Sequence, residues 1–494
     1  MAENFSMIFT DGALGASPAG PGRALLLVGP CSSGAENVVH VFESPRDVPG
    51  VLGYGPLAEM AAYALTVGAR GVTAKPVGCI RVPNASVTAG TVTTGAVVRG
   101  EPGSPSSGTM TLAGTPTDRF DIRVRITRAG GLGAAALRYS LDGAATESNE
   151  ILIPSADPLA LFATGLALSF TGSFEVGDTF AWSTTGPTFS SAAAVSALDA
   201  LESDSRAWPL VMIVGEPTGV DDATRATNAA SLVQELHTHL ELFTAQGRYM
   251  RGLVEGPRFV TSESSLSTAL ASALTPVSAK RVGISGGHCM VPSQINPRKM
   301  RVSIAWPYAA RAASVPFSQD PGDGGLGPLE GVIAGSLETN ATDRARYEGA
   351  RMFCLQPISG LNGYYVANSS MLAPVGSDYA ELPNGRVIDE ASRAARAKLL
   401  TYRRARIRVA KVGSPNAGRI DDRDAQRIET AVRSAVARAI LDTSDAVDVQ
   451  VVVNRTDNLL ATNTLRLRVR VTPYAYAKSI EVEIGLENPA LVGE

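Results

Sequence analysis

The chain has 494 residues, 45% of them apolar, which is enough for a large buried core and for about three domains of ~150 residues. Its 44 basic and 47 acidic residues give a formal net charge of -3, which argues against a nucleic-acid-binding protein, because such proteins usually carry a basic excess. The four cysteines lie far apart and never in CxxC spacing, so we expect neither a zinc site nor a disulfide framework.

The sequence indicates no secretory or membrane segment. Residues 1–22 lack a basic residue and a long apolar core, so they do not have the pattern of a signal peptide. No run in the chain approaches the ~20 apolar residues of a membrane-spanning helix. We therefore expect no direct insertion into a membrane.

The chain begins with an arm and an α/β layer. In residues 1–22, Gly, Ala, Ser and Pro surround a short apolar piece with Met7 and Phe9, which predicts an N-terminal arm. Residues 23–85 predict the first part of an α/β domain, because short apolar strands accompany a helix. The predicted elements are strands over 23–29, 38–44 and 71–78 and a helix over 56–69.

An inserted, β-sandwich-like domain is expected over residues 86–187. This segment is rich in Thr, Ser and Gly, and its turn signals recur at the spacing of a sandwich. The apolar residues Ile122, Val124 and Ile126 alternate with polar ones, as in a strand with one buried face. Only residues 157–168 suggest a helix within this segment.

The second half of the chain predicts two further parts. The α/β domain resumes over residues 188–375, and residues 376–494 predict a C-terminal α+β domain with an open sheet and a terminal strand. The whole is therefore expected to be an α/β and α+β multidomain protein. The predicted helices cover 190–204, 221–247, 384–405 and 421–441, and the predicted strands 208–217, 250–256, 280–287, 299–307, 405–411, 446–454, 464–471 and 479–488.

The last two predicted strands carry opposite charges. Residues 464–471 alternate apolar side chains with arginines, whereas residues 479–488 alternate apolar side chains with glutamates. Residues 472–478 between them suffice for a hairpin, in which each opposite-charge pair would contribute roughly 0.2–1 kcal/mol. This favours pairing within one subunit, while exchange of the last strand with another subunit remains the alternative.

Ser285 gives the sharpest enzymatic signal, because Gly283–Gly287 fits the G-x-S-x-G turn of α/β hydrolases. That motif needs a histidine from a later, separate loop, but the only later histidine, His288, lies three residues away. His237 and His239 lie two apart on a predicted helix and point about 200° apart, so they cannot share a metal ion. We expect no catalytic residues, no cofactor and no metal, and therefore no enzyme.

Several segments resemble the tail sheath proteins of contractile phages and related contractile injection systems. Residues 23–78 are similar to the family's N-terminal region, with a strand entering a Gly-bearing turn at 29–34, Leu-Gly-Tyr-Gly at 52–55 and then a helix. Residues 327–340 look like the family's Pro/Gly-x-Val-Ala-Gly segment. The order helix, strand, helix and three strands over 384–488 is similar to its conserved inner domain.

The resemblance implies a structural protein that polymerises as stacked hexameric rings around an inner tube and contracts to drive the tube through a cell envelope. It implies as partners further copies of the chain, the tail tube protein, and the baseplate and tail terminator proteins, without nucleic acid. The implied location is the tail sheath of a virion, assembled in the cytoplasm of a bacterial host. The alternatives are a tube, baseplate or fibre component of a virion, or a cytosolic α/β hydrolase that uses Ser285.

Two assembly surfaces follow from the resemblance. The first is a basic surface that faces the tube, for which a solvated helix face is the alternative; it comprises Arg393, Arg396, Lys398, Arg403 and Arg404. The second is strand pairing between subunits, through Ile480, Val482, Ile484, Leu486, Met7 and Phe9.

Overall fold

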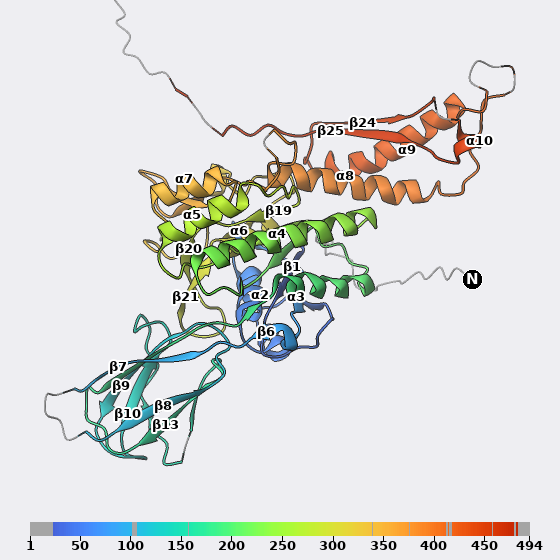
Figure 1. Cartoon of the computed structure of the whole chain (residues 1–494). Coiled ribbons are helices and arrows are strands. Elements are labelled where there is room, and N and C mark those ends of the chain that lie inside the picture. Colours follow the sequence, from blue (N-terminus) through green and yellow to red (C-terminus); the bar gives the residue numbers. More distant parts are fainter. Residues whose placement is uncertain are drawn as a thin grey trace, which may run out of the picture. The chain divides into compact units, whose positions relative to one another are not determined.

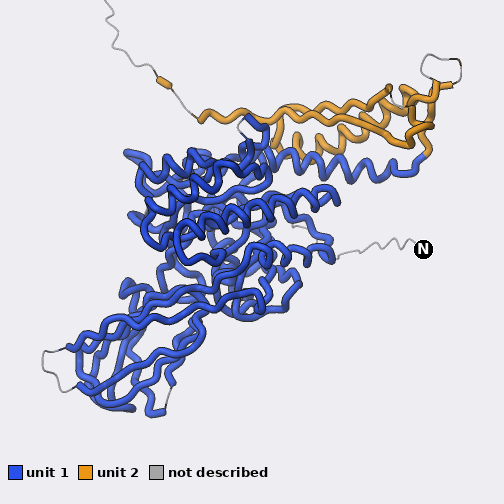
Figure 2. The backbone as a smooth tube through the Cα atoms, viewed as in Figure 1, with its two compact units in different colours: residues 1–405 blue, residues 406–494 orange. Residues whose placement is uncertain are grey.

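The computed structural model describes residues 23–100, 106–156, 158–337, 339–374, 376–411, 413, 417–456, 458–478 and 481–482. The fold is mixed α/β (Figure 1). The chain divides into two compact units, residues 1–405 and 406–494 (Figure 2), and each is described by itself. Within the described residues, no helix has the length and apolar character needed to cross a membrane.

A six-stranded sheet forms the centre of the first unit, in the order β19-β18-β16-β1-β5-β2. Its strands are β1 (Leu25–Gly29), β2 (His40–Phe42), β5 (Val77–Arg81), β16 (Leu210–Ile213), β18 (Arg251–Val254) and β19 (Val282–Ile284). All neighbours run parallel except the edge pair of β2 and β5. Parallel sheets need cover on both faces, and β1, β5, β16 and β18 are buried along their whole length.

Helices cover both faces of this sheet. They are α2 (Pro56–Thr66), α3 (Ser191–Ser196), α4 (Asp222–Ala245), α5 (Glu263–Leu274) and α6 (Ala305–Ser314). Leu25 and Leu27 of β1 belong to the core that contains α2 and α6. Leu26 and Val28 belong to the other core, with α3, α4 and α5. Because side chains alternate along a strand, this one short segment joins the two cores.

Shorter elements complete the α/β part of the first unit. The helices are α1 (Val48–Leu52), α7 (Ala341–Gly349) and α8 (Leu382–Leu400). The strands are β3 (Gly68–Ala69), β4 (Val72–Thr73), β6 (Val87–Thr88), β15 (Thr188–Phe189), β17 (Glu216–Pro217), β20 (His288–Pro292), β21 (Lys299–Ser303), β22 (Leu355–Pro357) and β23 (Tyr364–Val366). The helix predicted over 190–204 is α3 followed by a 3-10 helix, Ala197–Ser203.

The inserted strands form two sheets around a core of their own. One sheet has the order β11-β10-β9-β14-β7 and the other β12-β13-β8. Their strands are β7 (Val92–Val98), β8 (Thr109–Gly114), β9 (Asp121–Arg128), β10 (Ala136–Ser140), β11 (Ile151–Leu152), β12 (Leu159–Leu161), β13 (Leu166–Thr171) and β14 (Thr179–Thr184). Ile122, Val124 and Ile126 are buried in this core, as their alternation predicts. The core also takes Leu168 and Phe170 from the smaller sheet, so the two sheets pack face to face.

The helix predicted over residues 157–168 is wrong. The described part of this segment forms β12, a tight connection and the start of β13, with Leu161 opposite Leu166. Ala163 and Gly165 have positive φ angles of 63° and 73°, which a helix does not allow. The Leu and Ala residues favour a helix locally, but cross-strand pairing of β13 with β8 overrides that preference.

The second unit is a helix packed on a two-stranded antiparallel sheet. Its elements are α9 (Asp422–Ile440), β24 (Asp448–Val453), α10 (Leu459–Thr462) and β25 (Leu467–Thr472). Ile428, Val432, Val436 and Ile440 form the buried stripe of α9, spaced every fourth residue. The strand predicted over 405–411 is reduced to a single bridge between Val409 and Ile420.

Candidate functional site

In the second unit, α9 covers its sheet unevenly. The helix packs against β24, where Val449, Val451 and Val453 are buried. The register places Val471, Val469 and Leu467 of β25 directly opposite these residues, and so on the same face. The three β25 side chains are nevertheless only half-buried. The sheet therefore has an apolar strip that its own helix does not fully cover.

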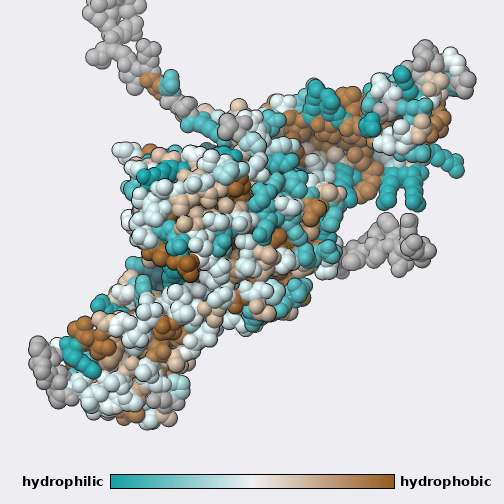
Figure 3. Space-filling model, viewed as in Figure 1, coloured by the Kyte–Doolittle hydropathy of each residue, from teal (hydrophilic) through white to brown (hydrophobic). Residues whose placement is uncertain are grey.

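The other face of this sheet is polar and basic. Arg468 lies opposite Val452 and Arg470 opposite Gln450, and all four side chains are exposed. This confirms the predicted alternation of arginines and apolar residues in residues 464–471. Apolar surface flanked by hydrophilic side chains is visible over this part of the chain in Figure 3.

The edges of the two-stranded sheet are open within the described residues. There, β24 and β25 pair with each other and with no third strand. Of the residues predicted to pair between subunits, Met7, Phe9, Ile480, Ile484 and Leu486 lie outside the described residues. Val482 is described, lies in no strand and is 70% exposed. Strand pairing through these residues stays a prediction.

The predicted basic surface divides into two groups. The Arg393 guanidinium donates to the carbonyl oxygen of Tyr249 at 2.9 Å and also binds Glu390, and that of Arg396 donates to the carbonyl oxygen of Gln246 at 2.9 Å. These two arginines therefore fasten α8 to the loop that follows α4. Lys398 is half-buried. The exposed members of the set are Arg403 and Arg404.

A buried ion cluster at the base of α8 was not foreseen from the sequence. The Asp389 carboxylate accepts from Arg251 Nε at 2.7 Å and Nη2 at 3.2 Å, and from Arg281 Nη1 at 3.1 and 3.2 Å. All three side chains are buried. Arg386, which also lies in the basic stretch, is only 2% exposed and has its guanidinium over the ring of Phe317. The spacing of charges on a helix does not reveal which of them turn inward.

Ser285 is part of a buried hydrogen-bond pair and not of an exposed turn. Its hydroxyl accepts from the backbone N–H of Gly256 at 2.8 Å and shares a 2.6 Å hydrogen bond with the Ser303 hydroxyl. His288 lies on β20, is 1% exposed, and burial together with nearby arginines holds its pKa well below the usual value. His239 of α4 is half-buried, with its Nε2 3.3 Å from Asp199 Oδ1. The two hydrogen bonds of the Ser285 hydroxyl thus go to structural neighbours, Gly256 and Ser303.

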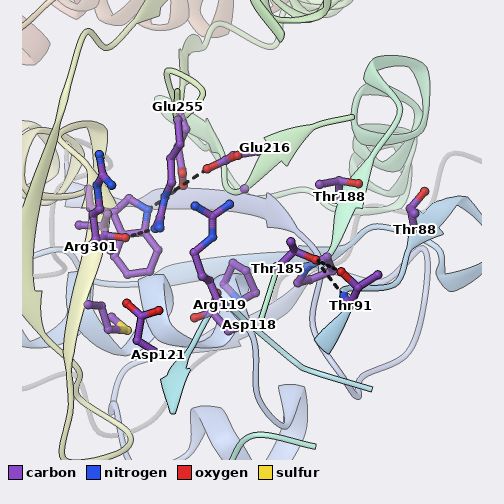
Figure 4. A pocket seen from close by; sticks show the side chains of 18 of the residues that line it. Thr88, Thr91, Asp118, Arg119, Asp121, Thr185, Thr188, Glu216, Glu255 and Arg301 are labelled. Atoms are coloured by element: carbon purple, nitrogen blue, oxygen red, sulfur yellow. Dashed lines mark hydrogen bonds and ion pairs between the residues drawn. The ribbon is translucent and has the colours of Figure 1, made fainter. Parts of the chain in front are cut away.

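A cavity of about 800 Å³ opens where the inserted strands meet the central sheet. The connection before β9 in the inserted domain contributes Asp118 and Arg119 to its lining, and the α/β part contributes Glu216, Glu255 and Arg301 (Figure 4). Such a volume is typical of small-molecule sites. No sequence motif marks this cavity, because its residues come from distant segments.

Glu255 is the most strongly shifted carboxyl in the cavity wall. Burial raises its pKa to about 7, although Trp306 Nε1 donates a 2.6 Å hydrogen bond to its Oε1. The native state therefore holds the proton more tightly than the unfolded chain, whose carboxyl has a pKa near 4.5. Stability is then lost as pH rises through the window from about 4.5 to 7.

Replacing Glu255 by glutamine should remove this pH dependence. Glutamine keeps a carbonyl oxygen for Trp306 but cannot ionise, so the variant should match the wild type at pH 4.5 and exceed its unfolding free energy by roughly 1–3 kcal/mol at pH 8. Urea unfolding across this range measures the difference, and Glu43→Gln, at an exposed position, corrects for the loss of one charge. Parallel pH profiles for Glu255→Gln and the wild type would contradict the argument.

Comparison with known proteins gives matches over nearly the whole chain. Residues 4–370 match the family model DUF2586, N-terminal domain, and residues 378–491 match DUF2586, C-terminal domain. No match was found among curated proteins. The boundary between the two family domains precedes α8, whereas α8 groups with the first compact unit.

Solved structures of contractile assemblies share the fold. A chain of the extracellular contractile injection system PVC sheath complex in its contracted state is 9% identical, covers 99% of this chain and 98% of its own length, and has a TM-score of 0.52. The anti-feeding prophage helical sheath in its contracted state is 12% identical, with coverages of 99% and 100% and a TM-score of 0.50. A chain of the contracted anti-feeding prophage baseplate is 11% identical, with 98% coverage of both chains and a TM-score of 0.53. The resemblance to contractile sheath proteins is thus confirmed at the level of the fold.

Proposed function

Since the chain belongs to the DUF2586 family and has the fold of contractile sheath proteins, we propose that it is the subunit of a contractile tail sheath. Subunits would polymerise as stacked hexameric rings around an inner tube and contract to drive that tube through a cell envelope. The observation that carries this proposal is that this chain and each of two sheath chains align over almost the full length of both partners. An isolated domain in common would not align the terminal regions as well.

The second unit supplies features suited to such an assembly. Within the described residues, its sheet has open edges and a half-covered apolar strip of Leu467, Val469 and Val471. An exposed strand edge is a template for a strand from another chain, with affinity from main-chain hydrogen bonds and register from alternating side chains. We assign the edge to a strand of a neighbouring subunit, either the arm at residues 1–22 or residues 479–488.

The proposal also implies which proteins the subunit contacts and which free energy drives contraction. The subunit would contact copies of itself, a tail tube protein, a baseplate and a tail terminator, in a virion or virion-like tail assembled in a bacterial cytoplasm. Contraction would draw on the free-energy difference between two packings of the same subunits. Neither a nucleotide nor a catalytic group is required for that change.

Electron microscopy of the purified full-length protein tests the proposal. Hollow cylinders built from six-membered rings are the expected result, either long or as short contracted fragments. A stable small monomer under all assembly conditions would overturn it. A baseplate component is the second candidate, because one of the similar chains comes from a baseplate structure; a single ring that never stacks would favour that role.

The tube-facing surface is best tested at its exposed members. We expect the double variant Arg403→Glu and Arg404→Glu to lower co-assembly with the tube at low salt by at least about tenfold, because the two reversed charges would face an acidic partner. The variant should fold normally, because both side chains are exposed. Co-sedimentation of sheath with tube measures the effect. Arg393 and Arg396 are poor choices, since their guanidinium groups hold α8 to the loop after α4. Unchanged co-assembly would show that these arginines are only a solvated face.

A further inference from the structure

Five arginines and Lys299 line the cavity between the inserted domain and the α/β part, against five carboxyl groups. Arg119 enters from the inserted domain, while Arg225, Arg258 and Arg301 enter from the α/β part. Glu216 forms ion pairs with two of these arginines. Arg225 Nη1 lies 3.2 Å from its Oε2, and Arg258 Nε lies 3.2 Å from its Oε1. One carboxylate thus balances two cations.

Within the described residues, the Arg119 guanidinium has no ion-pair partner. Within the described part of the chain, no acceptor atom hydrogen-bonds its guanidinium, and the nearest acid in sequence, Asp118, is bound by Arg298 at 2.6 Å. Figure 4 shows the Arg119 side chain reaching into the middle of the cavity. Its backbone is fixed, because Arg298 also donates to the Arg119 carbonyl oxygen at 2.8 Å. The Arg119 backbone is thus anchored beside the cavity, while its guanidinium, unpaired within the described residues, reaches into the cavity.

The electrostatics around the cavity agree with this geometry. His288, buried near the cavity, has its pKa lowered first by burial and then by four arginines, among them Arg258 and Arg119. Burial, Arg119 and Arg301 likewise lower the pKa of Arg258, to about 10. The arginines thus repel one another, and a bound anion would relieve that repulsion.

We propose that this cavity binds a small oxyanion, the phosphate or carboxylate group of a ligand, with Arg119 as its principal contact. A guanidinium is a planar fork of donors that binds two oxygens of such a group at once. The hydroxyl groups of Thr91, Thr185 and Thr188 line another part of the cavity and suit a polar remainder (Figure 4). Because both the inserted domain and the α/β part supply lining residues, the ligand links the two. This binding site is independent of the role of the chain in a sheath.

Calorimetric titration of the full-length protein tests the site, with inorganic phosphate and citrate as probes and sodium chloride at matched ionic strength as the reference. Saturable binding of one probe per chain is expected. Binding of phosphate alone identifies a phosphate ligand, and binding of citrate alone identifies a carboxylate ligand. Arg119→Gln should weaken the binding at least about tenfold, the value expected for loss of a charge-assisted contact.

Two further variants distinguish a site from general charge. Arg123→Gln removes the same charge from an exposed position of β9 outside the cavity and should bind the probe as the wild type does. Arg119→Lys keeps the charge without the fork and should fall between the wild type and Arg119→Gln, which also covers the case in which the glutamine variant does not fold. No saturable binding of either probe, or equal losses for Arg119→Gln and Arg123→Gln, would overturn the proposal.

Discussion

Replacing Asp389 by alanine is expected to lower the free energy of unfolding of the first unit by about 3–5 kcal/mol, because it leaves two buried guanidinium groups without their shared carboxylate. Arg251 and Arg281 both bind this carboxylate at 2.7–3.2 Å, and both are buried. In the native state, the ion pairs with Asp389 offset the free-energy cost of removing these two guanidinium groups from water. Urea unfolding of the dispersed subunit, followed by fluorescence, measures the loss.

The chain offers a matched control for this experiment 11 residues before Asp389. Asp378 is exposed and has no ion pair within the described residues, so Asp378→Ala should change stability by no more than about 0.5 kcal/mol. Asp389→Asn keeps one acceptor oxygen and should lose less than Asp389→Ala. If Asp389→Ala and Asp378→Ala behave alike, the buried cluster does not stabilise the fold.

Deleting residues 479–494 is expected to abolish cylinder formation while the subunit still folds. The core of the second unit forms without them, since α9 packs its apolar stripe against Val449, Val451 and Val453. The deletion would instead remove residues 479–488, one of the two segments that we assign to the open edge of a neighbour. Electron microscopy measures cylinder formation, while circular dichroism and gel filtration test whether the subunit is folded.

A shorter deletion serves as the control. Removing only residues 489–494, beyond the predicted strand, should leave cylinder formation intact. Loss of folding on deletion of 479–494 would instead favour the alternative hairpin within one subunit. Cylinders that form normally without 479–494 would contradict any role of this strand in assembly.

The sequence predicted those elements whose own pattern determines their environment. Each of three elements has a pattern that marks one face as apolar: the alternation in β9 and β25, and the fourth-residue spacing in α9. In the structure, the apolar residues of each element lie on its more buried face. The segment 157–168 failed because its Leu and Ala residues suit a helix, while a partner strand about fifty residues away decides the outcome.

The charged sites could be predicted only in part. A run of arginines marks α8 as basic, but whether Arg386 or Arg403 turns inward depends on residues that lie distant in the chain. The ion cluster joins Arg251 and Arg281 to Asp389, more than a hundred residues later. The cavity likewise gathers residues from many separated segments between Pro56 and Trp306. Contacts of this kind follow from the tertiary fold, which local periodicity does not contain.

The stem of the inserted domain has a consequence for how such chains diversify. The chain enters by β6 and leaves by β15, and these strands pair antiparallel, with Val87 opposite Phe189 and Thr88 opposite Thr188. The two ends of the insertion are therefore already adjacent, as in any site that tolerates an exchangeable module. A short turn in place of residues 89–187 would close this gap without altering the order of the central sheet. The inserted domain can thus be exchanged as one module, while the central sheet that carries it keeps its order.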